Sequence, residues 1–156
     1  MRGGYVLLIY IPSKTSLRIK SLGSISIDSG HWVYIGSAMG LGSTSLENRI
    51  SRHFRSKKKV HWHIDYLLSS KTKLKSAIWA SSQNPIECEL VTKLEANSNF
   101  RAGPKGFGAS DCKKKCISHL YQVLNEENIE DVISDIFREL KLKPKITYDG
   151  KITGCS

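Results

Sequence analysis

Long apolar runs are missing from the sequence. No stretch of its 156 residues approaches the roughly 18 apolar residues that a membrane-spanning helix needs. The apolar start, residues 5–11, is short, ends at Pro12 and has no small-residue cleavage site after it, unlike a secretory signal peptide. We therefore expect no membrane segment, and we expect the apolar start to form a buried strand.

Cysteine is scarce too, because the chain has four, at positions 88, 112, 116 and 155. They are too few and too unevenly spread for a disulfide scaffold. We therefore expect reduced thiols and a cytoplasmic protein. At 156 residues, 40% of them hydrophobic, the chain is predicted to be one domain with its own core.

Acidic residues are rare in the first half of the chain. Residues 1–86 contain 13 Lys or Arg against 3 Asp or Glu, whereas residues 87–156 contain 11 of each, so the net charge of +10 belongs to the first half. This asymmetry indicates a surface that binds polyanions, with nucleic acid the leading candidate. Anionic membrane is the weaker one, because no basic stretch has the wide apolar face of a membrane-surface helix.

Apolar periodicity predicts an α+β domain with a small antiparallel sheet flanked by helices. We expect about three main strands, with short extra edge strands in the Ser-rich residues 12–30. The main strands are predicted over residues 5–11, 31–36 and 74–81. The C-terminal part, residues 122–156, is expected to hold a helix and a hairpin with Asp149-Gly150 in its turn.

Helix signals occur at several further places. Thr44 and Glu47 fit a capping box, and Asn84-Pro85 fits a helix start. A helix with His61 and Asp65 as an i, i+4 pair is expected between these two starts. Residues 97–110 are expected to be a Gly-rich loop, and the later part of 111–124 to be helical.

Two polar residues of the first predicted helix lie beside its apolar stripe. Leu46, Ile50 and Phe54 form this stripe at i, i+4 and i+8. At about 100° per residue, Arg49 and His53 fall at the edge of the stripe. We therefore expect both side chains to be half sheltered, as site residues usually are.

An ordered set of short motifs resembles the GIY-YIG nuclease superfamily. The chain has Gly-Gly-Tyr at 3–5, VYIGSA at 33–38, RISRHF at 49–54 and Glu87-Cys88 after the third strand. KKKVHWHIDYLL, ECEL and GFGASDC…SHL further resemble a largely uncharacterised, archaeal-type prokaryotic branch of that superfamily. Gly-Gly-Tyr replaces Gly-Ile-Tyr, and residues 12–30 replace a family loop of roughly ten residues.

The resemblance covers residues 3–121 and implies an endonuclease that uses magnesium or manganese to hydrolyse phosphodiester bonds. It also implies roles for five residues. Tyr5 and Tyr34 are the motif tyrosines, Arg49 contacts the scissile phosphate, His53 follows one turn later, and Glu87 binds the metal. Arg49 and the metal are expected to lower the pKa of Tyr5 enough for it to take a proton from water.

Each of these residues also has an ordinary structural role open to it. Glu87, expected at the third helical position, is placed to cap its helix. Tyr5 and Tyr34 are typical sheet-packing aromatics. Arg49 is a typical surface charge, and a lone His53 is more often structural than catalytic.

Basic and histidine residues around the second helix are candidates for contacting nucleic acid. A solvated charge run is the alternative for the lysines, and metal binding and helix support are the alternatives for the histidines. The predicted nucleic-acid-binding residues are Arg52, Arg55, Lys57, Lys58, Lys59, His61 and His63.

Cys112, Cys116 and His119 form a C-x3-C-x2-H pattern that could bind zinc with a fourth ligand such as Cys155. The spacing is unusual, so we favour buried or capping thiols and expect magnesium or manganese to be the cofactor.

Three functions are considered for the whole chain, the third of them a small structural zinc protein. The first is a metal-dependent endonuclease acting on DNA rather than RNA, in repair, recombination or defence, with a protein partner that can supply targeting. The second is a module on the same scaffold that binds nucleic acid without cleaving it.

Overall fold

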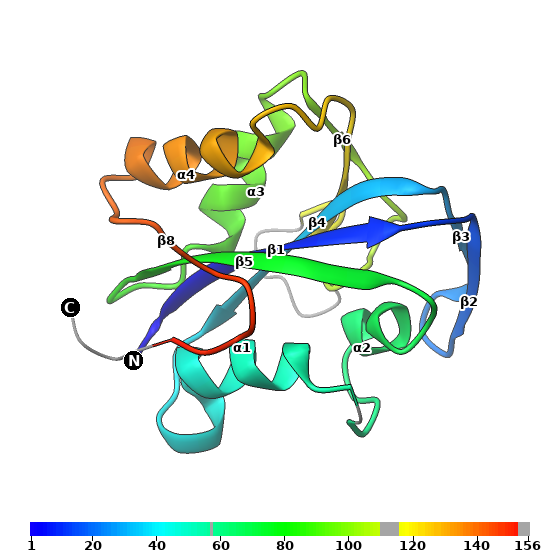
Figure 1. Cartoon of the computed structure of the whole chain (residues 1–156), viewed down its shortest axis with the longest axis horizontal. Helices are drawn as coiled ribbons and strands as arrows, with labels where there is room; N and C mark the ends of the chain where they lie inside the picture. Colours follow the sequence, from blue (N-terminus) through cyan, green and yellow to red (C-terminus); the bar gives the residue numbers. More distant parts are fainter. Residues whose placement is uncertain (57, 110–115, 153–156) are drawn as a thin grey trace.

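An antiparallel sheet with helices on both faces organises the chain (Figure 1). The structure is a computed structural model that describes residues 1–56, 58–109 and 116–152. It confirms the predicted α+β class. The elements are β1 (Gly3–Ile11), β2 (Thr15–Ile19), β3 (Gly23–Ile27), β4 (Gly30–Ala38), the 3₁₀ turn η1 (Gly42–Thr44), α1 (Leu46–Phe54), α2 (His63–Leu68), β5 (Lys73–Ser81), α3 (Glu87–Glu95), β6 (Phe100–Ala102), β7 (Leu120–Val123), α4 (Ile129–Glu139) and β8 (Lys145–Thr147).

The three predicted main strands form the centre of the sheet. Its strand order is β6-β7-β4-β1-β5-β8. β1 pairs antiparallel with β4 on one side and with β5 on the other. The two strands that carry the resemblance motifs, β1 and β4, are therefore direct neighbours despite the residues inserted between them.

The continuous apolar run of β1 is explained by burial on both faces of the sheet. Alternate residues of a strand point to opposite sides. Tyr5 and Leu7 pack in the cluster that contains α1 and α2, whereas Val6 and Leu8 pack with α3 and α4. Figure 1 shows these two pairs of helices on opposite faces. The strand register thus fixes the face on which Tyr5 lies, since a one-residue slip would reverse it.

The edges of the sheet differ from the sequence prediction. The later part of 111–124 was expected to be helical, but Leu120–Val123 form β7 between β4 and β6. Leu120, Tyr121 and Val123 are buried in two different clusters on either side of the sheet, which a strand achieves by alternation. The prediction of a helix in the later part of 111–124 is therefore wrong. β6 lies inside residues 97–110, which were expected to form only a loop.

At the opposite edge the predicted C-terminal hairpin is also wrong. β8 pairs with β5, not with a following strand, because residues 148–152 form a bend without strand structure. Gly150 adopts a positive φ of 84° in this bend. Its backbone N–H donates to Thr147 Oγ1 at 3.1 Å. Asp149-Gly150 therefore reverses the chain without creating a second strand.

The inserted residues 12–30 form a hairpin of their own. β2 and β3 pair with each other, so they do not extend an edge of the main sheet as expected. Ile19 and Ile27 are buried in the same core cluster as Ile64 and Leu67 of α2. The insertion is therefore part of the core on the α1 and α2 face.

Two of the helices begin at residues other than those predicted. The cap of α1 is Ser45, whose Oγ accepts from the Asn48 backbone N–H at 3.3 Å. Glu47 instead forms an ion pair with the N-terminal amine at 3.0 Å. Helix α2 begins at His63, so His61 lies before the helix. His61 and Asp65 therefore do not form the predicted i, i+4 pair within it.

Helix α3 begins at Glu87, two residues after Pro85, and its N-cap is Ile86. The predicted start at Asn84-Pro85 is therefore early. Glu87 is the first helical residue and not the third, so the capping role considered for it does not apply. Among the described residues, no helix has both the length and the apolar character needed to cross a bilayer.

Candidate active site

Residues from seven separate segments line a pocket of about 220 Å³. All five residues predicted to be catalytic lie in its wall. A larger hollow of about 540 Å³ elsewhere contains none of them. The lining residues of the smaller pocket are Tyr5, Tyr34, Gly36, Ser37, Arg49, His53, Trp62, Glu87, Gly108 and His119.

The two motif tyrosines face the same side because of the strand register. Tyr5 on β1 is paired with Gly36 on β4, and Tyr34 lies two residues before Gly36. Paired residues on antiparallel strands, and residues two apart on one strand, share a face of the sheet. Both phenols therefore point toward α1.

Tyr5 and His53 form a buried hydrogen bond between the sheet and α1. The distance from Tyr5 Oη to His53 Nε2 is 2.7 Å. Tyr5 is 3% exposed and His53 is 2% exposed, so His53 is more deeply buried than the half-sheltered position expected from its helix. This hydrogen bond links the strand of the first motif, β1, to α1, the helix that follows the second motif.

Burial and the charge of Arg49 act in opposite directions on the pKa of Tyr5 in the protein alone. Burial raises the pKa of Tyr5 well above its usual value, and Tyr34 beside it adds to the increase. Arg49 lowers the pKa as expected, but by less than burial raises it. Burial also raises the pKa of Tyr34. Both tyrosines are therefore neutral phenols at neutral pH in the protein alone.

His53 is neutral for a related reason. Burial lowers its pKa to about 3, and the nearby Arg52 and Lys58 contribute in the same direction against the opposing effect of Asp65. A neutral imidazole has one nitrogen with an available lone pair. Among the described residues, Nδ1 of His53 is buried and has no hydrogen-bond partner. His53 is therefore uncharged throughout the neutral range.

Arg49 extends from α1 to the end of β4. Its Nη1 donates to the Ser37 carbonyl oxygen at 2.6 Å, and its guanidinium lies 5.0 Å from the ring centroid of Trp62. Within the described part of the chain, its buried Nε–H has no acceptor. Arg49 is thus fixed by two contacts, and its Nε–H is available to an acceptor oxygen.

Glu87 reaches the pocket from the first turn of α3. Burial raises the pKa of its carboxyl group, and a hydrogen bond with Ser37 and the charge of Arg49 partly oppose this. Its Oε2 lies 3.9 Å from His119 Nδ1. Magnesium binds hard oxygen ligands and commonly takes only one or two protein carboxylates, so this single carboxylate fits such an ion.

The predicted nucleic-acid-binding residues separate into two groups. Arg52 donates through Nη1 and Nη2 to the two carboxylate oxygens of Asp65 at 2.9 and 3.0 Å, and Lys58 Nζ donates to two carbonyl oxygens at the end of α1. His63 accepts from the Gly108 N–H at 2.9 Å and is bonded to Ser21 Oγ at 2.7 Å. These three side chains support the structure.

The other members of the set are exposed. Arg55, Lys59 and His61 are exposed. Lys57 lies outside the described residues. The accessible part of the predicted basic surface is therefore smaller than the sequence count suggests.

Asp65 was considered only as a helix-supporting partner, but it organises the segment before α2. It is 0% exposed and accepts from Arg52 and from the backbone N–H groups of His61 and Trp62. Burial alone would raise the pKa of Asp65, but these hydrogen bonds hold it below the usual value. Arg52 also lies 4.3 Å from the Trp62 ring centroid, so the pair fixes the indole that forms one pocket wall.

The predicted zinc residues are placed only in part. Cys116 and His119 lie close together, whereas Cys112 and Cys155 lie outside the described residues. Cys88, which was not among the predicted zinc ligands, lies next to Cys116. Ser37 and Trp62 were also missed, since nothing but proximity to the motifs distinguishes them in the sequence.

Comparison with known proteins gives one family. A family model described as "Domain of unknown function DUF123" matches residues 4–142. A search of curated proteins and a search of solved structures each found no match. The matched residues extend from β1 through α4 and include every residue in the pocket wall. Because the match spans most of the chain, the protein belongs to the DUF123 family.

Proposed function

We propose that the protein is a metal-dependent endonuclease of the GIY-YIG superfamily that hydrolyses phosphodiester bonds, in DNA rather than RNA. One observation carries the proposal: the hydrogen-bonded Tyr5–His53 pair, Arg49 and Glu87 share a single small pocket. These residues come from three elements far apart in sequence. They are also the residues that the motif resemblance assigns to catalysis.

Arg49 supplies the positive charge that phosphodiester hydrolysis requires. The transition state carries more negative charge on the phosphate oxygens than the substrate does. A donor fixed in advance stabilises that charge without reorganising during the reaction. The bonds of Arg49 to Ser37 and Trp62 fix it in this way, and its unpaired Nε–H is the donor offered to the phosphate.

The Tyr5–His53 pair provides a route for the proton of the attacking water. As the water oxygen bonds to phosphorus, its proton passes to Tyr5 Oη, and the tyrosine proton passes to His53 Nε2 over the 2.7 Å contact. The bond to the leaving oxygen breaks, that oxygen takes a proton from solvent water, and His53 afterwards returns its extra proton to the solvent through Tyr5. An incoming phosphate raises the proton affinity of His53, whose pKa is low in the protein alone. Tyr34 lies beside the pair and orients the water or the phosphate.

Glu87 would hold magnesium or manganese through its carboxylate oxygens. When bound, the ion would supply positive charge that balances the charge of the phosphate. The raised pKa of Glu87 means that part of its binding strength is lost on mild acidification, because only the ionised carboxylate binds well. The chain's own contribution here is to place this carboxylate opposite Arg49.

A non-cleaving nucleic-acid-binding module is the second candidate. The exposed Arg55, Lys59 and His61 support binding in either case. A carboxylate beside a phosphate site weakens plain binding by charge repulsion, and Glu87 occupies that position. This favours the endonuclease.

The test is cleavage of labelled linear, branched and single-stranded DNA and of RNA, with magnesium, with manganese and with EDTA. Glu87→Gln is compared with Glu89→Gln, which removes a carboxylate from the same helical turn but outside the pocket wall. We expect metal-dependent cleavage in the wild type and in Glu89→Gln, with loss in Glu87→Gln.

Absence of cleavage by all three proteins, together with tight binding that weakens with salt, would support the binding module instead. With about six phosphate contacts, affinity should fall roughly a thousandfold between 50 and 200 mM salt. An affinity that does not change with salt would contradict both functions.

A further inference from the structure

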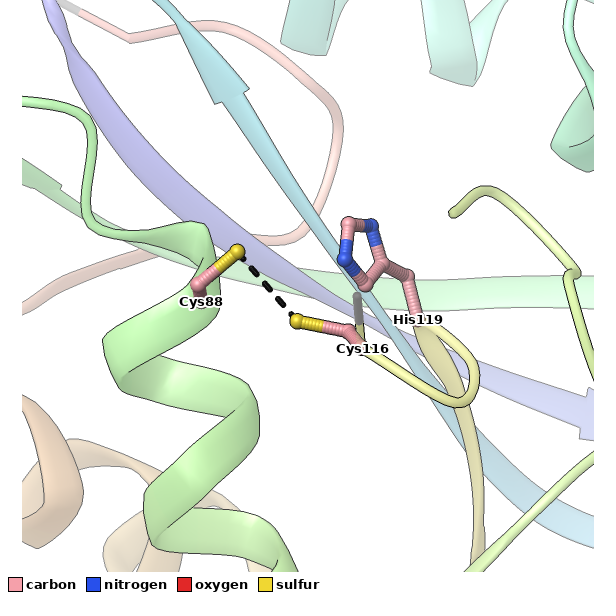
Figure 2. Close-up of side chains that lie close together, drawn as sticks. All are labelled: Cys88, Cys116 and His119. Atoms are coloured by element: carbon pink, nitrogen blue, oxygen red, sulfur yellow. Dashed lines mark hydrogen bonds between the residues drawn. The ribbon is translucent and has the colours of Figure 1, made fainter. Parts of the chain in front are cut away.

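Two thiols and an imidazole converge beside the pocket, outside the set used for the proposed reaction (Figure 2). Cys88 lies on the first turn of α3, and Cys116 and His119 lie on the segment that leads into β7. One ligand atom of each residue lies within 4.8 Å of the other two. Figure 2 shows both sulfurs and one edge of the ring directed toward a shared space.

His119 is prepared to act as a ligand. It is 2% exposed, so its ring is almost fully enclosed by the protein. Among the residues that the structure describes, its buried Nε2 has no hydrogen-bond partner. An unbonded nitrogen in a buried ring is costly unless something occupies the space in front of it.

The sulfur positions suit a bound metal after a small adjustment. Sγ of Cys116 lies 3.2 Å from Sγ of Cys88. Two thiolates bound to zinc at about 2.3 Å in tetrahedral geometry lie roughly 3.8 Å apart, so the thiols need to separate by about half an ångström. Thiolate and imidazole are the ligands that zinc takes in proteins, whereas magnesium prefers oxygen.

We propose that Cys88, Cys116 and His119 form a binding site for zinc or a similarly thiophilic divalent metal, separate from the carboxylate site at Glu87. The bound ion joins the first turn of α3 to the segment before β7. The ligand set differs from the C-x3-C-x2-H pattern in the sequence, because Cys88 comes from a distant segment.

This site would position Glu87 as well as stabilise the fold. Cys88 is the next residue after Glu87, and Nδ1 of His119 lies 3.9 Å from Glu87 Oε2. A metal that fixes Cys88 and His119 therefore fixes both neighbours of the carboxylate. Its role does not depend on the proposed nuclease activity, because a structural metal is measured without a substrate.

The experiment measures metal content and the cobalt spectrum of the untagged full chain. Wild type purified without chelator is analysed for zinc, then stripped and titrated with Co²⁺. We expect about one zinc per chain and a sulfur-to-cobalt charge-transfer band with the visible bands of a tetrahedral ion. Cys88→Ser, Cys116→Ser and His119→Asn should each weaken cobalt binding at least tenfold.

Two control variants test whether zinc binding is specific to these three ligands. His31→Gln removes a histidine that is paired with Glu126 near the start of β4, and Glu87→Gln removes the neighbouring carboxylate. Both should retain zinc. Equal zinc loss in Glu87→Gln would overturn the separation of the two sites.

If the ligand variants fail to fold, the zinc content and the cobalt spectrum of the wild type still test the proposal. Substoichiometric zinc together with no thiolate band on cobalt titration would overturn the proposal. A Cys88–Cys116 disulfide, detected as a two-proton mass decrease in protein isolated without oxidant, would also overturn it. Retention of zinc alongside absent DNA cleavage would leave this site standing and count only against the proposed nuclease.

Discussion

The phenol of Tyr5 lies against the backbone of Gly36, its pairing partner on the neighbouring strand. A Cβ atom at Gly36 would lie 2.5 Å from Tyr5 Oη, closer than side chains tolerate. The glycine of the second motif is therefore needed because the tyrosine of the first motif crosses over it. This relationship gives a physical reason why the two motifs occur together.

We expect Gly36→Ala to displace the Tyr5 hydroxyl and break its bond to His53. Overpacking of this kind typically costs about 1–3 kcal/mol in the free energy of unfolding. Urea unfolding measures this cost in a double-mutant cycle with Tyr5→Ala. Because removal of the ring removes the clash, Gly36→Ala should cost much less in the Tyr5→Ala background. Equal costs in the two backgrounds would show that the contact is not the cause.

The buried, neutral His53 should make the protein sensitive to acid. In the unfolded chain this histidine takes up a proton near pH 6.5, whereas in the folded protein its pKa is about 3. Between these values the unfolded state binds the extra proton, so stability is present above pH 6.5 and decreases as pH falls. The decrease should be roughly 1.4 kcal/mol per pH unit.

His53→Gln should remove this contribution. Urea unfolding at pH 7, 5.5 and 4.5 compares the wild type, His53→Gln and His61→Gln, whose replaced side chain is exposed. We expect a flatter pH dependence only in His53→Gln. A wild-type slope shared by all three proteins would assign the acid sensitivity to other groups.

Local sequence patterns predicted the positions that depend on a single element. The stripe of Leu46 and Ile50 placed Arg49 and His53 at the sheltered edge of α1, and both line the pocket. The apolar run at residues 5–11 likewise located β1. Such features can be predicted because the period of one helix or strand decides which side chains are covered.

Features that depend on several elements were missed. The effect of burial on the pKa of Tyr5 was not predicted, because the extent of burial depends on α1 and β4 packing around it. The proximity of Cys88 to Cys116 depends on how α3 packs beside the segment before β7. β7 is only four residues long, which leaves too little periodicity to distinguish a strand from a helix.

Removal of the Asp65 carboxylate should destabilise the protein strongly. Asp65→Ala leaves Arg52 without its carboxylate partner and leaves the N–H groups of His61 and Trp62 without their acceptor. Breaking a buried pair in this way typically costs about 3–5 kcal/mol. Thermal and urea unfolding measure the loss, with Asp28→Ala as the control, because Asp28 is exposed and lies 3.9 Å from Lys14.

The companion variant Arg52→Ala tests whether the two residues act as a pair. In the double variant the cost should be smaller than the sum of the two single costs, since neither partner is then left alone. Additive costs would mean that Asp65 acts only as a cap for the segment before α2.

Substitution of Arg49 should separate catalysis from binding. Arg49→Ala removes the fixed donor, so the cleavage rate at saturating substrate should fall about a hundredfold or more, as for other single transition-state donors. DNA affinity should change much less, because exposed charges such as Arg55 and Lys59 remain.

Arg55→Ala is the matched control and should show the reverse pattern, with weaker binding and a nearly unchanged rate at saturation. Single-turnover kinetics and binding titrations at the same salt concentration measure the two quantities. If Arg49→Ala lowers affinity and rate by the same factor, Arg49 holds the substrate in its ground state and does not selectively stabilise the transition state.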